Sequence, residues 1–174
     1  MKFTPLSIKG AFLIEIQEIK DERGSFARQF CKKEFAACGL DFDIKQCNIS
    51  RNYKAGVLRG MHYQHEPYSE TKIVSCPQGA FFDVLVDLRK DSETYLKWLG
   101  VELSAQNNKA LYIPKNCAHG FQTLQDNTVV YYQIDGYYMP DYAGGIRWDD
   151  PKIGIEWKRY SNIINDRDKN YPLI

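Results

Sequence analysis

The sequence has few histidines, no paired cysteine motif and no long apolar run, and each absence removes a class of protein. Its five cysteines are far apart and form no CxxC pair. That pattern argues against a disulfide framework or a zinc site and indicates reduced thiols. No apolar run approaches the roughly 20 residues that a membrane helix needs. The opening MKFTPLSIKG lacks the apolar middle of a signal peptide, so we expect a soluble, cytoplasmic protein.

The chain also has almost no net charge. It carries 23 Lys plus Arg against 22 Asp plus Glu, so we expect no basic surface for nucleic acid or for an anionic membrane. We find no repeat, low-complexity tract or linker, and 174 residues suit one packed core. We therefore expect a single domain over residues 1–174.

Aromatic residues are abundant, with 12 Tyr, 9 Phe and 3 Trp, and such residues favour strands and line pockets. Apolar segments separated by Gly, Pro, Asn and Asp recur along the chain; they span 11–19, 42–50, 56–64, 71–76, 79–89, 98–104, 110–114, 120–124 and 128–134. This rhythm is typical of an all-β sandwich or barrel, and a two-sheet jelly roll fits it best.

Helical signals are weak. The one helical window is CKKEFAACG, residues 31–39, which Gly39 closes. From Tyr137 onward we expect irregular structure. Long flat sheet edges must be covered, so we expect the N-terminal segment to pair with a second copy of the chain.

The stretch GVLRGMHYQ, residues 56–64, places Arg59 and His62 in what reads as a buried strand. Both groups are costly to desolvate, which indicates that a polar ligand meets them there. His65 lies three positions after His62, so in a strand the two would point to opposite faces. That spacing does not suit a shared metal, although His119 could in principle join one of the two. Three histidines without paired spacing are a weak metal signal, so we expect no metal site, and we read His65 as a solvated loop residue.

Other polar side chains interrupt later strands. Lys72 leads into a buried strand, where it is either an edge residue or a cation at a pocket mouth. Asp83 lies between apolar neighbours and needs a histidine or lysine on an adjoining strand. Tyr131 and Tyr132 alternate, so one of them points inward. A histidine, a cation and a tyrosine converging inside a barrel suggest proton transfer beside a carbonyl.

Ordered blocks over nearly the whole chain match a known family. They are DERGSFARQF (21–30), QCNIS (46–50), GVLRGMHYQ (56–64), TKIVSC (71–76), FDVLVDLRKDSETYLKW (82–98), LSAQN (103–107), YIPKNCAHGF (112–121), YYMP (137–140), GIRWDDPKIGIEW (145–157) and INDRD (164–168). In these blocks the chain resembles the dTDP-4-dehydrorhamnose 3,5-epimerase family. The resemblance implies a cofactor-free jelly roll of the cupin type, usually a dimer with exchanged N-terminal strands, that acts on a nucleotide-diphosphate keto-sugar.

The resemblance also implies roles for individual residues. His62 would be the base, paired with Asp168; Tyr132 would be the acid on the opposite face of the sugar. Lys72 would lie near the 4-keto oxygen. Arg59 and His119 would surround the sugar and diphosphate. The positions that would shape the nucleotide and sugar pocket are Arg23, Phe26, Gln46, Asn48, Tyr138 and Trp148. The implied reaction is epimerisation at C3, C5 or both, converting dTDP-4-dehydro-6-deoxyglucose to dTDP-4-dehydro-L-rhamnose.

The chain departs from the better-known members at a few positions. Arg28 replaces a glutamate in the expected pocket wall. Three readings stay open: the arginine accommodates a different nucleotide base or an additional anionic group, a neighbour such as Glu22 or Asp43 compensates its charge, or it is a solvated surface residue. Cys47 replaces a common acidic residue, and the segment 48–57 is one residue longer. These departures keep a mono-epimerase or a 3,4-ketoisomerase on a CDP-, GDP- or dTDP-linked sugar open.

Two other classes of protein also stay open at this point. One is a non-catalytic sugar-binding cupin, which the intact His62, Asp168 and Tyr132 disfavour. The other is a metal-dependent dioxygenase, which the histidine spacing disfavours.

Overall fold

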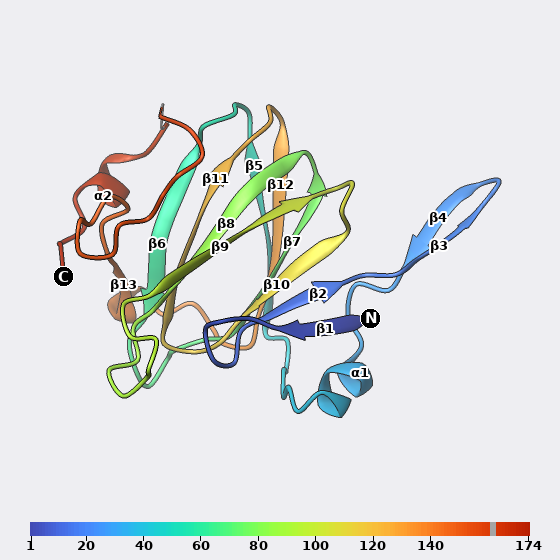
Figure 1. The fold of residues 1–174 in the computed structure, drawn as a ribbon, viewed down its shortest axis with the longest axis horizontal. Coiled ribbons are helices and arrows are strands. Elements are labelled where there is room, and N and C mark those ends of the chain that lie inside the picture. Colours follow the sequence, from blue (N-terminus) through green and yellow to red (C-terminus); the bar gives the residue numbers. More distant parts are fainter. Residues whose placement is uncertain (161–162) are drawn as a thin grey trace.

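The computed structural model describes residues 1–160 and 163–174, and in these ranges the chain forms two packed antiparallel sheets with little helix (Figure 1). A six-stranded sheet has the order β1 (Lys2–Pro5), β2 (Phe12–Glu15), β10 (Lys109–Ile113), β7 (Lys72–Gln78), β12 (Thr128–Ile134) and β5 (Gln46–Asn52). A five-stranded sheet has the order β13 (Ala143–Gly145), β6 (Leu58–Gln64), β11 (Cys117–Thr123), β8 (Ala80–Asp87) and β9 (Trp98–Ser104). The expected all-β jelly roll is confirmed.

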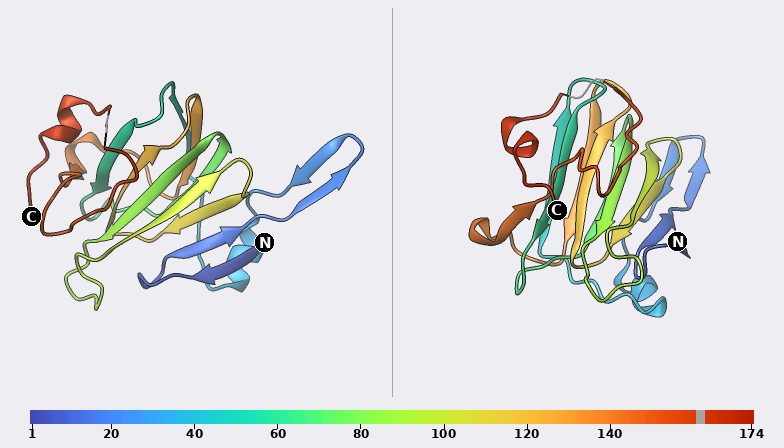
Figure 2. Two further views of the ribbon diagram at one scale, coloured as in Figure 1. Left: turned by 45° about the horizontal axis from the view of Figure 1, so that its top comes forward. Right: turned by 60° about the vertical axis from the view of Figure 1, so that its left-hand side comes forward.

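The N-terminal segment departs from the predicted single strand over 11–19. After β2 the chain leaves the body and forms a separate hairpin from β3 (Glu18–Asp21) and β4 (Gly24–Ala27), which projects away from both sheets (Figure 2). Ile19 and Phe26 face each other in its register and are 70% and 66% exposed. An isolated two-stranded hairpin is marginally stable in water. β1 pairs with β2 of its own chain, so the hairpin is the part of this segment that reaches outward.

The predicted helix is present as α1 (Lys32–Ala37), and Gly39 follows it with a positive φ of 73°. Phe35 of α1 is fully buried against Tyr112 of the six-stranded sheet, with ring centroids 6.3 Å apart. Phe42 packs against Phe35 in the same cluster. This packing explains why the strand expected from residue 42 begins only at Gln46, as β5.

β8 is buried along its whole length because both of its faces are covered. Phe81 and Leu85 point into the core between the two sheets. Phe82, Val84 and Val86 point the other way, where part of the C-terminal third, including Ile146 and Ile153, packs over them. Period-two alternation thus explains a strand that is apolar on both sides.

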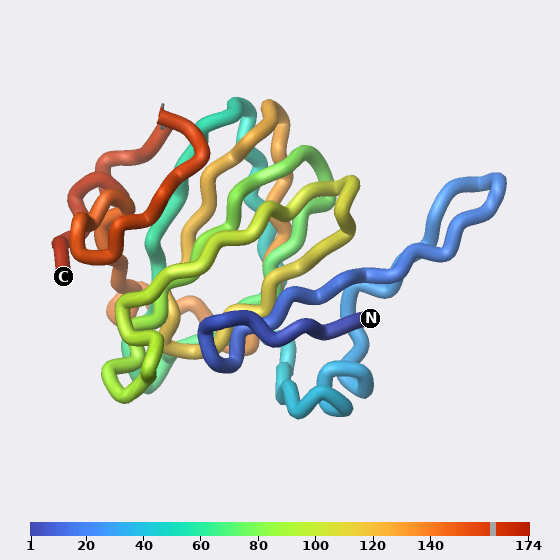
Figure 3. The backbone as a smooth tube through the Cα atoms, viewed as in Figure 1, coloured from blue at the N-terminus to red at the C-terminus, as the bar shows by residue number. Residues whose placement is uncertain are grey.

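The C-terminal third is largely irregular, as expected, but it includes a short 3-10 helix, η1 (Pro140–Tyr142), and α2 (Asp166–Lys169). Its path returns along the five-stranded sheet and brings α2 beside β6 (Figure 3). This return path places residues near position 168 next to residues near position 60.

β6 and β11 approach each other very closely at two glycines. A Cβ atom on Gly60 would lie 2.6 Å from the Cα of Gly120, and Gly60 has a positive φ of 125°. Only glycine fits such a position without displacing the neighbouring backbone. The two glycines thus let the strands that carry His62 and His119 lie close together. These two histidines are cross-strand partners.

All five cysteines are free thiols. Among the described residues, the helices are too short and too polar to cross a membrane.

Candidate active site

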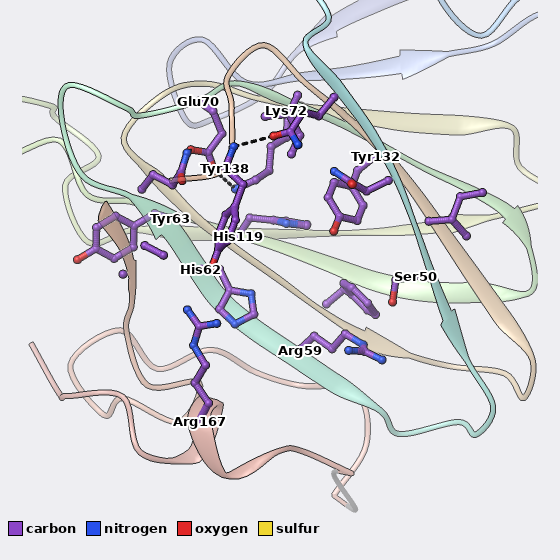
Figure 4. A pocket seen from close by; sticks show the side chains of 18 of the residues that line it. Ser50, Arg59, His62, Tyr63, Glu70, Lys72, His119, Tyr132, Tyr138 and Arg167 are labelled. Atoms are coloured by element: carbon purple, nitrogen blue, oxygen red, sulfur yellow. Dashed lines mark hydrogen bonds and ion pairs between the residues drawn. The ribbon is translucent and has the colours of Figure 1, made fainter. Parts of the chain in front are cut away.

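A cavity of about 620 Å³ opens between the two sheets (Figure 4). Its volume is in the range of small-molecule sites. Four of the predicted site residues line it from the six-stranded sheet: Gln46, Asn48, Lys72 and Tyr132. Arg59, His62 and His119 line it from the five-stranded sheet, and Tyr138 lines it from the C-terminal third. Eight of the predicted residues therefore surround one cavity.

His62 is paired with Asp168 of α2. Its Nε2 lies 2.8 Å from Oδ1 of Asp168, a residue that is only 1% exposed. The other carboxylate oxygen accepts the backbone N–H of Gly60 at 2.9 Å. The carboxylate is held in place because Asn165 caps α2 by accepting the N–H of Asp168 at 2.7 Å.

The electrostatics of this pair favour an ionised Asp168. Burial acts to raise the pKa of Asp168, but the hydrogen bonds from His62 and Gly60 outweigh it, and the pKa lies below its usual value. An ionised carboxylate can only accept, so Nε2 of His62 must carry a proton. In the neutral ring, Nδ1 is then the nitrogen that can take up a proton.

Tyr132 lies on the opposite wall of the cavity from His62, as Figure 4 shows. Tyr131, its neighbour on β12, lines a separate depression with Ser75 and Cys76, which confirms that only one of the two tyrosines points into the cavity. Burial raises the pKa of Tyr132, while Arg59 pulls it the other way. The hydroxyl therefore stays protonated at neutral pH and can donate.

Lys72 lies deeper than the predicted position at the pocket mouth. Its side chain is 10% exposed and pairs with Glu70, Nζ to Oε1, at 2.8 Å. Glu70 also lines the cavity and accepts a hydrogen bond from Gln64 at 2.7 Å. Lys72 thus presents a fixed ammonium inside the cavity, on the wall that carries Tyr132 and across from the wall that carries His62.

Asp83 has the partner that its apolar surroundings required. Its Oδ1 lies 2.6 Å from Nε2 of His119, on the adjoining strand β11, which confirms the expected pairing. Its other oxygen has no hydrogen-bond partner among the described residues. Burial raises the pKa of Asp83, and His119 and Lys72 oppose the shift.

Three arginines, Arg51, Arg59 and Arg167, add positive charge to the cavity. Arg59 is held by Asn52, its Nε donating to Oδ1 at 2.9 Å. Arg167 rises from α2 toward His62 (Figure 4). Sequence reasoning missed Arg167, although it is part of the INDRD block beside Asp168. Guanidinium groups in this arrangement suit a diphosphate.

Some predicted residues lie outside this cavity. Arg23 and Phe26 are on the projecting hairpin, and Arg28 follows it directly. Trp148 does not line the cavity either; its carbonyl accepts the indole N–H of Trp157 at 2.9 Å. A single chain does not bring these four residues to His62.

Arg28 does have a neighbouring carboxylate as its partner, but the partner is Glu34 and neither of the suggested residues, Glu22 and Asp43. Arg28 pairs with Glu34 of α1, with Nη1 and Oε1 3.4 Å apart. Asp43 pairs instead with Lys32 and Lys45. Glu34 lies in α1, and a turn of the chain brings it next to Arg28. Local sequence patterns do not reveal this turn.

The histidines do not converge on a common ion position. In the ranges that the structure describes, no three His, Cys, Asp or Glu side chains are grouped so that they could hold a metal ion. His62 and His119 are instead each paired with a buried carboxylate.

The sequence and the fold both match known proteins. The family model described as dTDP-4-dehydrorhamnose 3,5-epimerase matches residues 5–174. A relative of that name from Methanothermobacter thermautotrophicus is 43% identical, over 99% of this chain and 94% of its own. The solved Bacillus anthracis epimerase with TDP and PPi bound has a TM-score of 0.97 and 40% identity, over 99% of both chains. The Legionella pneumophila enzyme in complex with dTDP-4-keto-L-rhamnose has a TM-score of 0.94 and 34% identity, covering 99% of this chain and 92% of that one. The chain belongs to the dTDP-4-dehydrorhamnose 3,5-epimerase family.

Proposed function

We propose that this protein epimerises dTDP-4-dehydro-6-deoxyglucose at C3 and C5, giving dTDP-4-dehydro-L-rhamnose. One observation carries the proposal. A histidine on a buried carboxylate faces a protonated tyrosine across a cavity, and a buried ammonium lines the same cavity. Inversion of a carbon next to a ketone needs a base on one face, an acid on the other and a cation at the oxygen.

The chemistry starts from the C4 ketone, which acidifies the hydrogens on C3 and C5. Nδ1 of His62 takes the proton, and the electron pair of the C–H bond forms an enolate whose oxygen accepts a hydrogen bond from Lys72. The Tyr132 hydroxyl then gives its proton to the opposite face of the same carbon. The imidazolium and the phenolate return to their starting states by proton exchange with solvent, so the net reaction is an isomerisation that needs no cofactor.

Each charged or polar group around the cavity has its own proposed role. Asp168 stabilises the imidazolium that forms on His62, because its carboxylate is ionised and fixed. Arg59 and Arg167 would hold the diphosphate, and His119 would bind the sugar. A positioned acid or base typically contributes about 10²–10⁴-fold, and a donor to the oxyanion about 10²–10³-fold.

The direct test is proton NMR in D₂O with the purified protein and dTDP-4-dehydro-6-deoxyglucose. We expect deuterium at both C3 and C5, with couplings that show inversion at both carbons. Exchange at one carbon would make the protein a mono-epimerase. No exchange would reject this substrate and direct the same assay to CDP- and GDP-linked keto-sugars.

We further propose that the working form is a homodimer in which the hairpin of one copy completes the cavity of the other. The exposed Ile19 and Phe26 need a cover, and Arg23 and Arg28 are placed away from the cavity of their own chain. Edge strands and hairpins of this kind are ready partners for a second chain.

Mixed dimers test this arrangement. Co-expression of His62→Asn with Arg23→Ala should restore activity to about one quarter of the wild-type level, as expected for random pairing in a twofold dimer. In the mixed dimer, the Arg23→Ala copy keeps an intact His62 and receives an intact hairpin. Each variant alone should have little activity. If the mixture is no more active than the two variants measured separately, the hairpin does not serve the partner's cavity.

A further inference from the structure

Glu70 and Lys72 form a buried ion pair on the cavity wall. Their side chains are only 7% and 10% exposed, and Nζ lies 2.8 Å from Oε1. Both oxygens of Glu70 are used, since Oε2 accepts from Gln64 at 2.7 Å. Such a pair costs desolvation, and replacing it with apolar side chains often leaves a protein as stable or more so. Its presence beside His62 and Tyr132 therefore calls for a role other than stability.

Charge gives the first indication of that role. Glu70 has the one carboxylate among the described residues that line the cavity, while Arg51, Arg59, Lys72 and Arg167 are cationic. A diphosphate would be repelled by Glu70, so the carboxylate does not serve to attract the substrate. What it contacts is the ammonium of Lys72, a group on a flexible four-carbon chain that samples many rotamers when it is unrestrained.

Gln64 extends the contact to a second part of the cavity. Its amide nitrogen donates to Glu70 and to the carbonyl of Tyr137 at 3.1 Å, and its oxygen accepts the N–H of Met139 at 2.6 Å. Tyr138, between those two residues, lines the cavity. One chain of hydrogen bonds thus runs from the Lys72 ammonium to the backbone on either side of Tyr138.

The backbone at Gly136 also lies very close to Glu70. A Cβ atom on Gly136 would lie 3.0 Å from the Cβ of Glu70. The segment that leads to Tyr138 can approach Glu70 this closely because residue 136 has no side chain.

We propose that Glu70 is a positioning residue of the epimerase. It holds the Lys72 ammonium at the place where negative charge develops on the C4 oxygen as the enolate forms. Through Gln64, it also connects that ammonium by hydrogen bonds to the segment that carries Tyr138. This inference rests on the proposed function, which gives Lys72 its task. Glu70 acts through Lys72 and does not itself exchange a proton with the sugar.

The test is a double-mutant cycle on kcat and KM with Glu70→Gln and Lys72→Met. Glutamine keeps the shape of Glu70 and can still bond Gln64, but it lacks the charge. We expect Glu70→Gln to lower kcat at least about 10-fold with KM changed less than about 3-fold, because displacing a catalytic group by a fraction of an ångström is already costly. In the Lys72→Met background the same change should have no further effect on kcat.

Stability provides a second readout in the same four proteins. Lys72→Met leaves the carboxylate buried without its cation and should lower Tm, and adding Glu70→Gln should restore much of that loss. Glu93→Gln removes an exposed carboxylate that does not line the cavity and is the matched control; its kcat, KM and Tm should equal those of the wild type.

Three outcomes would overturn the inference. A wild-type kcat in Glu70→Gln would mean that Lys72 needs no positioning. A raised KM with unchanged kcat would mean that Glu70 contacts the substrate. Multiplying losses in the double variant would mean that the two residues act independently. A wild-type kcat in Lys72→Met would instead contradict the role that the proposed function gives to Lys72.

Discussion

Replacing His62 with asparagine is expected to lower kcat by about 10³–10⁴-fold and to abolish deuterium uptake at both C3 and C5. Asparagine can still occupy the place of the ring, so the cavity keeps its shape, but it has no basic nitrogen. Without the base the first proton is not removed, and exchange with solvent stops together with inversion. The measurement is proton NMR in D₂O alongside a coupled assay of kcat and KM.

Asp168→Asn should give a loss of similar size for a different reason. The asparagine amide can donate to Nε2 of His62, which would place the proton of the neutral ring on Nδ1 and leave no acceptor facing the sugar. A wrong tautomer alone can cost about 10⁴-fold where a histidine base depends on a carboxylate. Activity near the wild-type level in this variant would mean that the carboxylate does not set the tautomer.

His65→Asn is the matched control for His62→Asn. His65 is exposed, follows the end of β6 and does not line the cavity. We expect normal turnover from it. If His62→Asn kept its exchange at C3 and C5, another base would have to act, and the proposed mechanism would be wrong.

Replacing Tyr132 with phenylalanine is expected to separate proton exchange from inversion. His62 can still remove a proton and return it, or a deuteron from D₂O, to the face from which it came. The acid on the other face is missing, so inversion should fall by about 10²–10⁴-fold. In D₂O the substrate should therefore gain deuterium while its couplings stay those of the starting sugar.

Tyr131→Phe is the control for this variant, because Tyr131 is adjacent on β12 but does not line the cavity. It should epimerise normally. Full epimerase turnover in Tyr132→Phe would remove Tyr132 from the mechanism. Loss of exchange as well as inversion would mean that the hydroxyl is needed for proton removal or for binding.

Alternation of residue types with a period of two predicted much of the fold. Successive side chains of a strand point to opposite faces, so the local sequence shows which face is buried. The same alternation predicted that only one of Tyr131 and Tyr132 would face the cavity. It also showed that Asp83 needed a basic partner, and His119 is that partner. The pairing of His62 with Asp168 came from the resemblance, since 106 residues separate them and no local pattern connects them.

Contacts made by loops were harder to foresee. Glu34 lies in a short helix, and nothing near Arg28 indicated that this helix folds back toward it. Glu70 stands two positions before Lys72 and outside β7, so strand alternation does not apply to it, but the closeness of two opposite charges in the sequence could have been noticed. The contacts of Gln64 could not have been noticed in the sequence, because its partners at residues 137 and 139 come from a distant irregular segment.

The sequence by itself determined the strand pattern, the family and the set of chemical groups, since these depend on residue types and their local spacing. Only the tertiary structure decided which of those groups meet. It placed Asp168 against His62, Lys72 against Glu70, and the hairpin with Arg23 and Phe26 outside the cavity of its own chain. The physical reason is that hydrogen bonds and ion pairs depend on distances of about 3 Å, and the path of the chain between remote segments sets those distances.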